Sequence, residues 1–359
     1  MLFIPHKHLY TSDASYVSSD EPDYKEVITD ANSRRRMGRL LKMAVWCGLK
    51  SLDGVPSERV AGIITSTGAG FMKDTISFGS SIFDREETLL NPSPFMQSTF
   101  NTASGYIALI RKIHAYNTTY VQQADGFAAS LVDAAMLLDD AGEGDVALVG
   151  AFDEVTPEVD VIRQRLGLYR VGDGFLPLGE GAAAFLLSAA MPTDVSESCP
   201  ATEMSAGLSG DDSSESDSVR DGDANSECST GPLRESESAS ERGGESGSKS
   251  SFCPLHEYGK TSYSSLNGTK DGNAALRFCG LANLSDLPKC AENPIAELFG
   301  INACVNVISC ADHVESLGAF RSLLPVLLCK LISEQKIPDG YTAIVDDVNE
   351  DGVIVLLHK

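Results

Sequence analysis

The chain has 359 residues, with 28 Lys and Arg against 51 Asp and Glu, which gives a formal net charge of −23 at pH 7. Proteins that bind nucleic acid or anionic membranes without specificity need basic surface, so this charge argues against both classes. Hydrophobic residues make up 42% of the chain, but no apolar run approaches the roughly 20 residues that cross a bilayer. Residues 1–12 lack the basic and apolar regions of a signal peptide, and the nine cysteines show no C-x-x-C spacing. We therefore expect a cytoplasmic protein with no membrane span, no metal and no cofactor.

Two ordinary amphipathic helices are predicted in the first third of the chain. Apolar side chains recur at spacings of three and four over residues 37–52, the pattern of one buried helix face. Asn32 or Ser33 suits the N-cap of this helix. Asn101 likewise suits the N-cap of a helix over residues 102–113. Both helices are interpreted as structural.

The densest positive charge in this acidic chain is the run Arg34, Arg35 and Arg36, at the start of the first helix. A solvated helix start explains it most simply. The alternative is that these side chains dock an acidic carrier protein.

A pattern of strand, long helix, strand and strand occurs twice. The first copy covers residues 120–123, 128–138, 146–152 and 182–187, and the second covers residues 303–309, 315–332, 341–345 and 353–357. Both long helices are apolar nearly all round, which is typical of helices buried on all sides. Two such helices in two β-rich halves predict helices packed between two sheets. A single α/β domain with one deep helix would account for only half of the pattern.

Residues 194–251 differ from the rest in composition. They contain 14 Asp and Glu, 4 Lys and Arg, 17 Ser and no aromatic residue. Such a segment cannot bury enough apolar surface to offset the backbone entropy of folding, about 1–2 kcal/mol per residue. We interpret it as a disordered insertion. A phosphorylated or partner-binding acidic arm is the alternative.

Residues 172–183 read GDGFLPLGEGAA, and Arg35-Arg36-Met37 lies in the first predicted helix. These stretches resemble the RDGFVxGEGA segment and the RRMSR…KMA helix of the β-ketoacyl synthases. Residues 95–108, FMQSTFNTASGYIA, resemble a segment of ketosynthase-like proteins of the aryl-polyene and dialkylresorcinol pathways. The resemblance implies a thiolase-like fold, with two pseudo-repeated halves in a five-layer αβαβα stack. The halves would be residues 1–193 and 252–359, on either side of the insertion.

The resemblance also implies that the catalytic residues are degenerate. Family members place a nucleophilic Cys at the N-terminus of the first buried helix and use two histidines to decarboxylate the malonyl unit. Phe127 stands where the Cys belongs, and Asn267 where the first histidine belongs. His313 is retained, and pseudo-symmetry would make it cap the second buried helix as Phe127 caps the first. As a lone histidine it could also simply bond a backbone carbonyl.

Other nucleophiles are weaker candidates. Ser130 lies one turn into an apolar helix and is interpreted as a packing or back-bonding hydroxyl. Cys310 lies three residues before His313, where an imidazole could activate a thiol. Cys304 and Cys310 are better explained as small apolar side chains of a buried strand region.

Three hypotheses follow. The first is a catalytically silent subunit, analogous to a chain-length factor, that pairs with an active ketosynthase and shapes the tunnel for an acyl chain carried by acyl carrier protein. Its dimer interface, by resemblance, would include Asn101, Tyr120 and Gln122, and pairing with itself is the alternative. The second is a residual acyltransferase or malonyl decarboxylase that uses Asn267 and His313. The third is a scaffold or carrier-docking module that binds through the acidic insertion.

Overall fold

The structure is a computed structural model that describes residues 9–18, 20–122, 125–189, 275–349 and 352–359. The described residues belong to one unit of the chain, Met1–Glu197 with Ser265–Lys359, which is called the first unit below. The predicted insertion over residues 194–251 and the candidate residue Asn267 lie outside the described residues. All helices and strands named below belong to the first unit.

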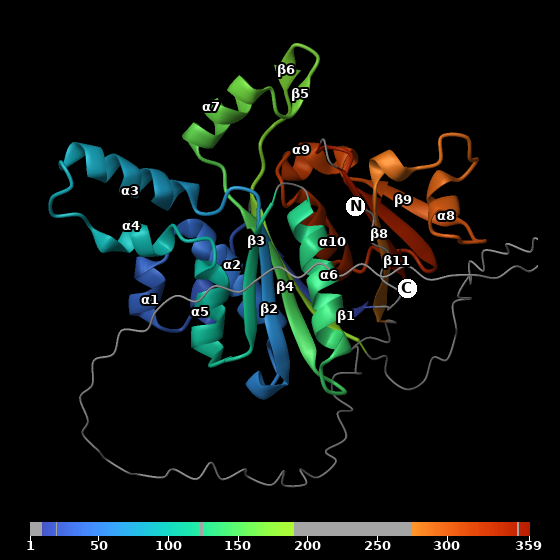
Figure 1. Cartoon of the computed structure of the whole chain (residues 1–359), viewed down its shortest axis with the longest axis horizontal. Coiled ribbons are helices and arrows are strands. Elements are labelled where there is room, and N and C mark those ends of the chain that lie inside the picture. The colour runs from blue at the N-terminus through green and yellow to red at the C-terminus, as the bar shows by residue number, and fades with distance from the viewer. Residues whose placement is uncertain (1–8, 19, 123–124, 190–274, 350–351) are drawn as a thin grey trace, which may run out of the picture. The chain divides into compact units, whose positions relative to one another are not determined.

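One nine-stranded sheet runs through this unit, in the order β3-β2-β4-β7-β1-β8-β11-β10-β9 (Figure 1). The strands β3, β2 and β4 are parallel, β9 and β10 are parallel, and the pairs between β4 and β10 along the sheet are antiparallel. The strands are β1 (Leu9–Val17), β2 (Val60–Thr67), β3 (Tyr116–Val121), β4 (Val146–Asp153), β7 (Gly181–Ser188), β8 (Leu276–Asn283), β9 (Val305–Ser309), β10 (Tyr341–Val345) and β11 (Val353–His358). A separate hairpin joins β5 (Arg170–Val171) to β6 (Gly174–Phe175).

The helices lie on both faces of this sheet and between its two halves. They are α1 (Ala31–Arg36), α2 (Arg39–Ser51), α3 (Met72–Asp84), α4 (Pro92–Gln97), α5 (Thr102–Arg111), α6 (Asp125–Asp139), α7 (Pro157–Leu166), α8 (Pro294–Leu298), α9 (Val314–Leu317) and α10 (Leu323–Ser333).

Three hydrophobic clusters define the layers. The first joins α2 and α5 to one face of β4 and β7, and the second joins α6 and α10 to the other face of these strands. Neighbouring residues of β4 therefore belong to different cores, with Leu148 in the first and Val149 in the second. The second cluster also reaches β11 through Val355, while Ile354 joins α8 in the third. Five layers in the order αβαβα result, as the resemblance implies, but the two predicted sheets are one continuous sheet, because β1 pairs with β8.

The predicted duplication is confirmed. The succession β3-α6-β4-β7 in the first half corresponds to β9-α10-β10-β11 in the second. In each half the strand after the helix pairs in parallel on one side and antiparallel with the last strand on the other. The halves differ in strand order, because β2 lies between β3 and β4 whereas β9 pairs directly with β10.

The single helix predicted over residues 315–332 is wrong. The chain forms the short α9, turns at Gly318 with φ +77°, and starts α10 only at Leu323. Between the two helices Ala319 donates its N–H to Pro177 O at 2.7 Å and accepts from Gly179 N at 3.2 Å. A Cβ at Gly318 would lie 2.2 Å from Gly179 N. This close backbone approach holds the 177–179 segment of the first half against the second half.

The helix predicted over residues 37–52 is present as α2, but a break at Met37 and Gly38 separates it from the predicted caps Asn32 and Ser33. Asp30, not Asn32 or Ser33, caps α1, and α2 begins at Arg39. At the break the Gln97 side-chain amide donates to Arg36 O and accepts from Gly38 N at 2.9 Å. One buried amide therefore satisfies the backbone groups that the break exposes.

The expectation that both long helices are buried on all sides holds for α10 but not for α6. Eight of the eleven residues of α10 are buried. On α6, Met136 is 62% exposed, and Ala128, Ala129 and Val132 are only partly buried. One face of α6 is therefore open.

Candidate functional site

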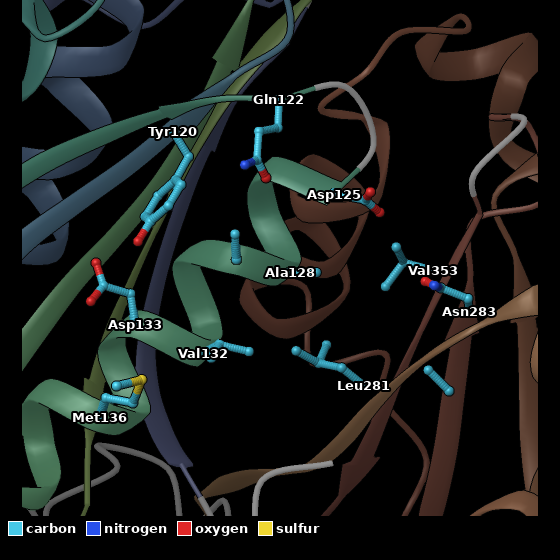
Figure 2. Close-up of a pocket in the computed structure, with 12 residues that line it drawn as sticks. Tyr120, Gln122, Asp125, Ala128, Val132, Asp133, Met136, Leu281, Asn283 and Val353 are labelled. Carbon is cyan, nitrogen blue, oxygen red and sulfur yellow. The ribbon is translucent and has the colours of Figure 1, made fainter. Parts of the chain in front are cut away.

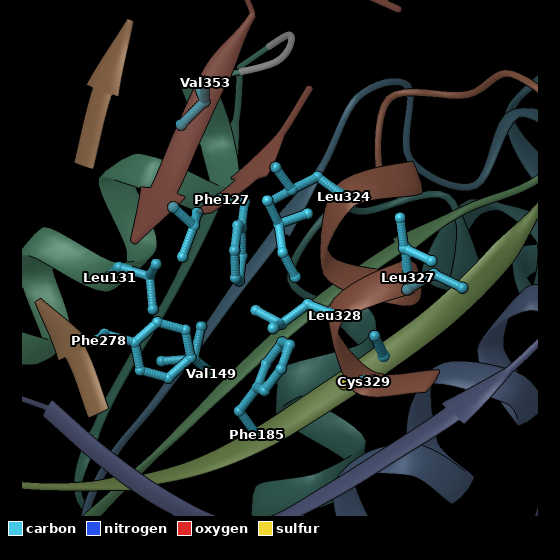
Figure 3. Close-up of a cluster of buried hydrophobic side chains, with 14 of the residues drawn as sticks. Phe127, Leu131, Val149, Phe185, Phe278, Leu324, Leu327, Leu328, Cys329 and Val353 are labelled. Carbon is cyan, nitrogen blue, oxygen red and sulfur yellow. The ribbon is translucent and has the colours of Figure 1, made fainter. Parts of the chain in front are cut away.

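Phe127 occupies the first turn of α6, between the two halves of the sheet (Figure 3). Its side chain is 5% exposed, and its ring centroid lies 5.6 Å from that of Phe185 on β7. Phe185 in turn packs edge-on against Phe278 on β8, at 6.2 Å. The start of α6 is thus filled by an aromatic stack that links the two halves. A benzyl side chain has no nucleophilic atom.

The other predicted nucleophiles are not poised to react. Ser130 donates its hydroxyl to Gly126 O at 2.8 Å, which is the back-bonding expected from sequence. Cys310 is buried, and burial together with Asp346 and Asp347 raises the pKa of its thiol. Such a thiol stays protonated and unreactive. The expectation that Cys304 is buried with it is wrong, because β9 begins one residue later and leaves Cys304 exposed.

His313 lies at the N-cap position of α9, where its ring makes no hydrogen bond with the described residues. The prediction that it caps the second buried helix is wrong, because the turn at Gly318 separates α9 from α10. The N-cap position of α10 is Ser322. The residual-enzyme hypothesis pairs His313 with Asn267, which lies outside the described residues.

Sequence reasoning missed a buried carboxylate that joins the halves. Asp153 ends β4 and accepts hydrogen bonds from Gly68 N at 2.8 Å, Ala69 N at 3.3 Å and the Thr67 hydroxyl at 3.1 Å. The Ser322 hydroxyl, at the start of α10, donates to its second oxygen. Burial raises the pKa of this carboxyl, against the effect of its four donors. These contacts give Asp153 a structural role.

A second buried carboxylate stands at the equivalent position of the other half. Asp346 directly follows β10 and accepts from the Asn349 side-chain amide at 2.7 Å and from Asn349 N at 3.3 Å. Asn349 Oδ1 accepts from the Tyr169 hydroxyl at 3.0 Å, and the Arg321 guanidinium lies 5.8 Å from the Tyr169 ring centroid. Burial raises the pKa of Asp346 as well. The duplication therefore includes a buried Asp at the C-terminal end of the equivalent strands.

The three arginines of the basic run, Arg34, Arg35 and Arg36, differ in their contacts. Arg34 donates to Ile28 O at 2.5 Å and Thr29 O at 3.3 Å, so its guanidinium secures the chain before α1. Arg35 and Arg36 are exposed. Two of the three predicted carrier contacts are thus available to a partner.

Of the three residues predicted for a dimer interface, Tyr120 lies on β3, an edge strand of the sheet, and Gln122 directly follows it (Figure 2). Asn101 is exposed at the start of α5, although its side chain does not cap that helix. Tyr120 and Gln122 line a groove of about 510 Å³ over the open face of α6. The groove is lined by Tyr120, Gln122, Asp125, Ala128, Ala129, Val132, Asp133, Met136, Leu281, Ala282, Asn283 and Val353.

Across the described ranges, no three His, Cys, Asp or Glu side chains gather as a metal site requires. In the same ranges, every helix falls short of the length and hydropathy of a bilayer-spanning helix.

The duplicated five-layer stack, with α6 and α10 between the halves of the sheet, defines a thiolase-like α/β protein. Residues 12–207 match the family model described as the β-ketoacyl synthase N-terminal domain, and the chain belongs to that family. A comparison with curated proteins found no match.

Solved structures share the fold. The ishigamide ketosynthase/chain length factor is 14% identical, with 94% of this chain and 85% of that chain covered and a TM-score of 0.53. A type II polyketide synthase acyl-carrier protein in complex with its hexaketide-bound ketosynthase, AntDE:AntF, is 13% identical, with 98% and 99% covered and a TM-score of 0.56. The ketosynthase ApeO in complex with its chain length factor ApeC from Xenorhabdus doucetiae is 16% identical, with 53% of this chain and 79% of that chain covered. Its TM-score is 0.36, so the two structures superpose poorly.

Proposed function

We propose that this chain is a catalytically silent β-ketoacyl synthase-like subunit, analogous to a chain-length factor, that pairs with an active ketosynthase. The pair would elongate an acyl or polyene chain carried by acyl carrier protein, with this chain shaping the space that receives the product. The family assignment supports this role. So do the names of the two structures that share the fold, one a ketosynthase/chain length factor and the other a ketosynthase with its acyl-carrier protein.

The observation that carries the proposal is Phe127. In a condensing enzyme the N-terminus of this helix presents a thiolate, which the helix dipole stabilises. Here the position holds a buried phenyl ring in contact with Phe185. Ser130 is turned back onto its own helix, and Cys310 is buried with a raised pKa, so neither replaces the thiolate. A subunit of this kind contributes shape and surface rather than a thioester.

The surface around β3 supports pairing. An edge strand with unpaired backbone groups is a template for another chain unless it is covered or blocked. Apolar side chains flank this edge on three elements, with Leu109 74% exposed on α5, Tyr116 and Val121 exposed on β3, and Met136 exposed on α6. Exposed apolar patches of this kind mark interaction sites.

A second apolar surface lies on the hairpin of α3 and α4 (Figure 1). Phe78 and Phe95 pack together across it, at 5.1 Å between ring centroids, yet none of the thirteen residues of α3 is buried. Phe83 is 84% exposed. A partner subunit that covers this hairpin would bury these side chains.

The test is co-expression with a ketosynthase from the same source organism. We expect a Cys-containing ketosynthase to co-purify with the tagged chain in equal amounts and to lose activity or solubility without it. Leu109→Glu should abolish co-purification while leaving the fold intact, because it places a charge in the apolar surface beside β3. Leu166→Glu, at a similarly exposed leucine on α7, is the matched control. A stable homodimer of this chain that becomes acylated by acyl carrier protein would contradict the proposal.

A further inference from the structure

The open face of α6 forms the floor of the groove beside β3 (Figure 2). Ala128, Val132 and Met136 follow one another at helical spacing along this floor, and Leu281 on β8 and Val353 on β11 form the far wall. Small and apolar side chains on a helix allow a second helix to approach closely. The floor is therefore suited to a packed contact rather than to solvent.

The charge of the groove is of one sign. Two carboxylates, Asp125 and Asp133, line it, and none of its twelve lining residues is basic. The whole of α6 contains three Asp and no Lys or Arg. Charged groups buried in an interface are costly unless an opposite charge pairs with them.

Asp133 lies opposite the middle of β3. The Tyr116 hydroxyl donates to Asp133 Oδ2 at 3.0 Å from one end of the strand. Near the other end, burial and the neighbouring Asp133 raise the pKa of Tyr120 to about 12. The carboxylate is thus placed between residues 116 and 120 of a strand that spans Tyr116–Val121.

The position of Asp133 determines which side chain of a second copy it would face in a dimer. A copy that extends the sheet by pairing β3 antiparallel with β3 in a centred register does so about a twofold axis through the middle of the strand, and such an axis brings each surface patch against itself. Because α6 packs against β3, the two α6 helices would lie side by side with their Asp133 carboxylates near the axis. Like charges juxtaposed in an interface are strongly unfavourable.

We propose that the groove takes the equivalent helix of a ketosynthase subunit that presents Lys or Arg opposite Asp133, and that this charge match selects that partner over a second copy of this chain. The inference rests on the proposed pairing function and names the chemistry of the partner surface.

The test uses the chain itself as the probe. Differently tagged wild type and Asp133→Lys are studied alone and mixed by sedimentation velocity at 150 mM and 500 mM NaCl. We expect each protein alone to be monomeric and the mixture to dimerise at least tenfold more tightly, with the gain lost at 500 mM because salt screens the contact. Asp140→Lys makes the same charge change just past the end of α6, outside the groove, and should give no dimer with wild type.

Three results would overturn the inference. One is a wild-type chain that self-associates as tightly as the mixture, the second is dimerisation by the Asp140→Lys mixture, and the third is a folded Asp133→Lys that does not pair with wild type. If Asp133→Lys fails to fold, Asp133→Asn keeps an acceptor for Tyr116, and it should strengthen self-association relative to wild type. Failure here is distinguishable from failure of the proposed function, since co-purification with the ketosynthase is measured separately.

Discussion

Replacing Asp153 should reveal how strongly the two halves depend on each other. Asp153→Ala removes the acceptor for two backbone N–H groups, of Gly68 and Ala69, and for the hydroxyls of Thr67 and Ser322. The hydroxyls can rotate to other partners, but the N–H groups cannot. A fully buried donor left unpaired costs about 1–3 kcal/mol, and Gly68 and Ala69 are half-buried, so we expect a loss of roughly 2–4 kcal/mol. This is a large part of the about 5–15 kcal/mol that stabilises a domain.

The free energy of unfolding from urea titration measures this loss. Ser322→Ala removes one donor and leaves three, so it should cost only about 1 kcal/mol. Because both changes act through one hydrogen bond, the double variant should be no less stable than Asp153→Ala alone, within about 0.5 kcal/mol. Asp173→Ala, at an exposed carboxylate, is the control. The reasoning would be refuted if the free energy of unfolding of Asp153→Ala lay within about 1 kcal/mol of that of wild type. It would also be refuted if Ser322→Ala were as unstable as Asp153→Ala.

Three further predictions concern the turn at Gly318, the titration of Asp346 and the reactivity of two cysteines. Gly318→Ala should destabilise the fold by several kcal/mol or prevent folding, because its Cβ would lie 2.2 Å from Gly179 N and its φ is positive; thermal unfolding measures this. Burial raises the pKa of Asp346, so the folded state holds this proton more tightly than the unfolded state, and its contribution to stability falls as pH rises through the raised pKa. The stability of wild type minus that of Asp346→Asn should therefore decrease from pH 4 to pH 7, and a constant difference would contradict the assignment. Iodoacetamide followed by peptide mass spectrometry should label the exposed Cys304 quickly and the buried Cys310 only on unfolding; rapid labelling of Cys310 would reopen its candidacy as a nucleophile.

Elements buried on both faces were predictable from sequence. The strands β4 and β7 read as continuous apolar runs because their alternate residues enter two different cores. The start of β3 was missed because Asn117, Thr118 and Thr119 give an edge strand little apolar signal. The break at Gly318 was also missed, since apolar residues lie on both sides of it and only the close approach of Gly179 requires the turn.

Some features of the candidate site were also predictable from sequence, and others were not. Phe127 could be placed at the start of a central helix from the apolar pattern and the family resemblance, and it lies there in the second core. The hydrogen bond between Ser322 and Asp153 joins residues 169 positions apart, so no local pattern could reveal it. The open face of α6 was equally hidden, because Met136 is apolar and reads as a core residue.

The central claim is that this chain pairs with a ketosynthase but never carries the acyl group. The most direct test is intact-mass spectrometry of the co-purified pair after incubation with acyl-loaded carrier protein. We predict an acyl mass increment on the ketosynthase subunit alone, which is removed when its Cys is replaced. The same increment on this chain, sensitive to hydroxylamine as a thioester is, would contradict the claim.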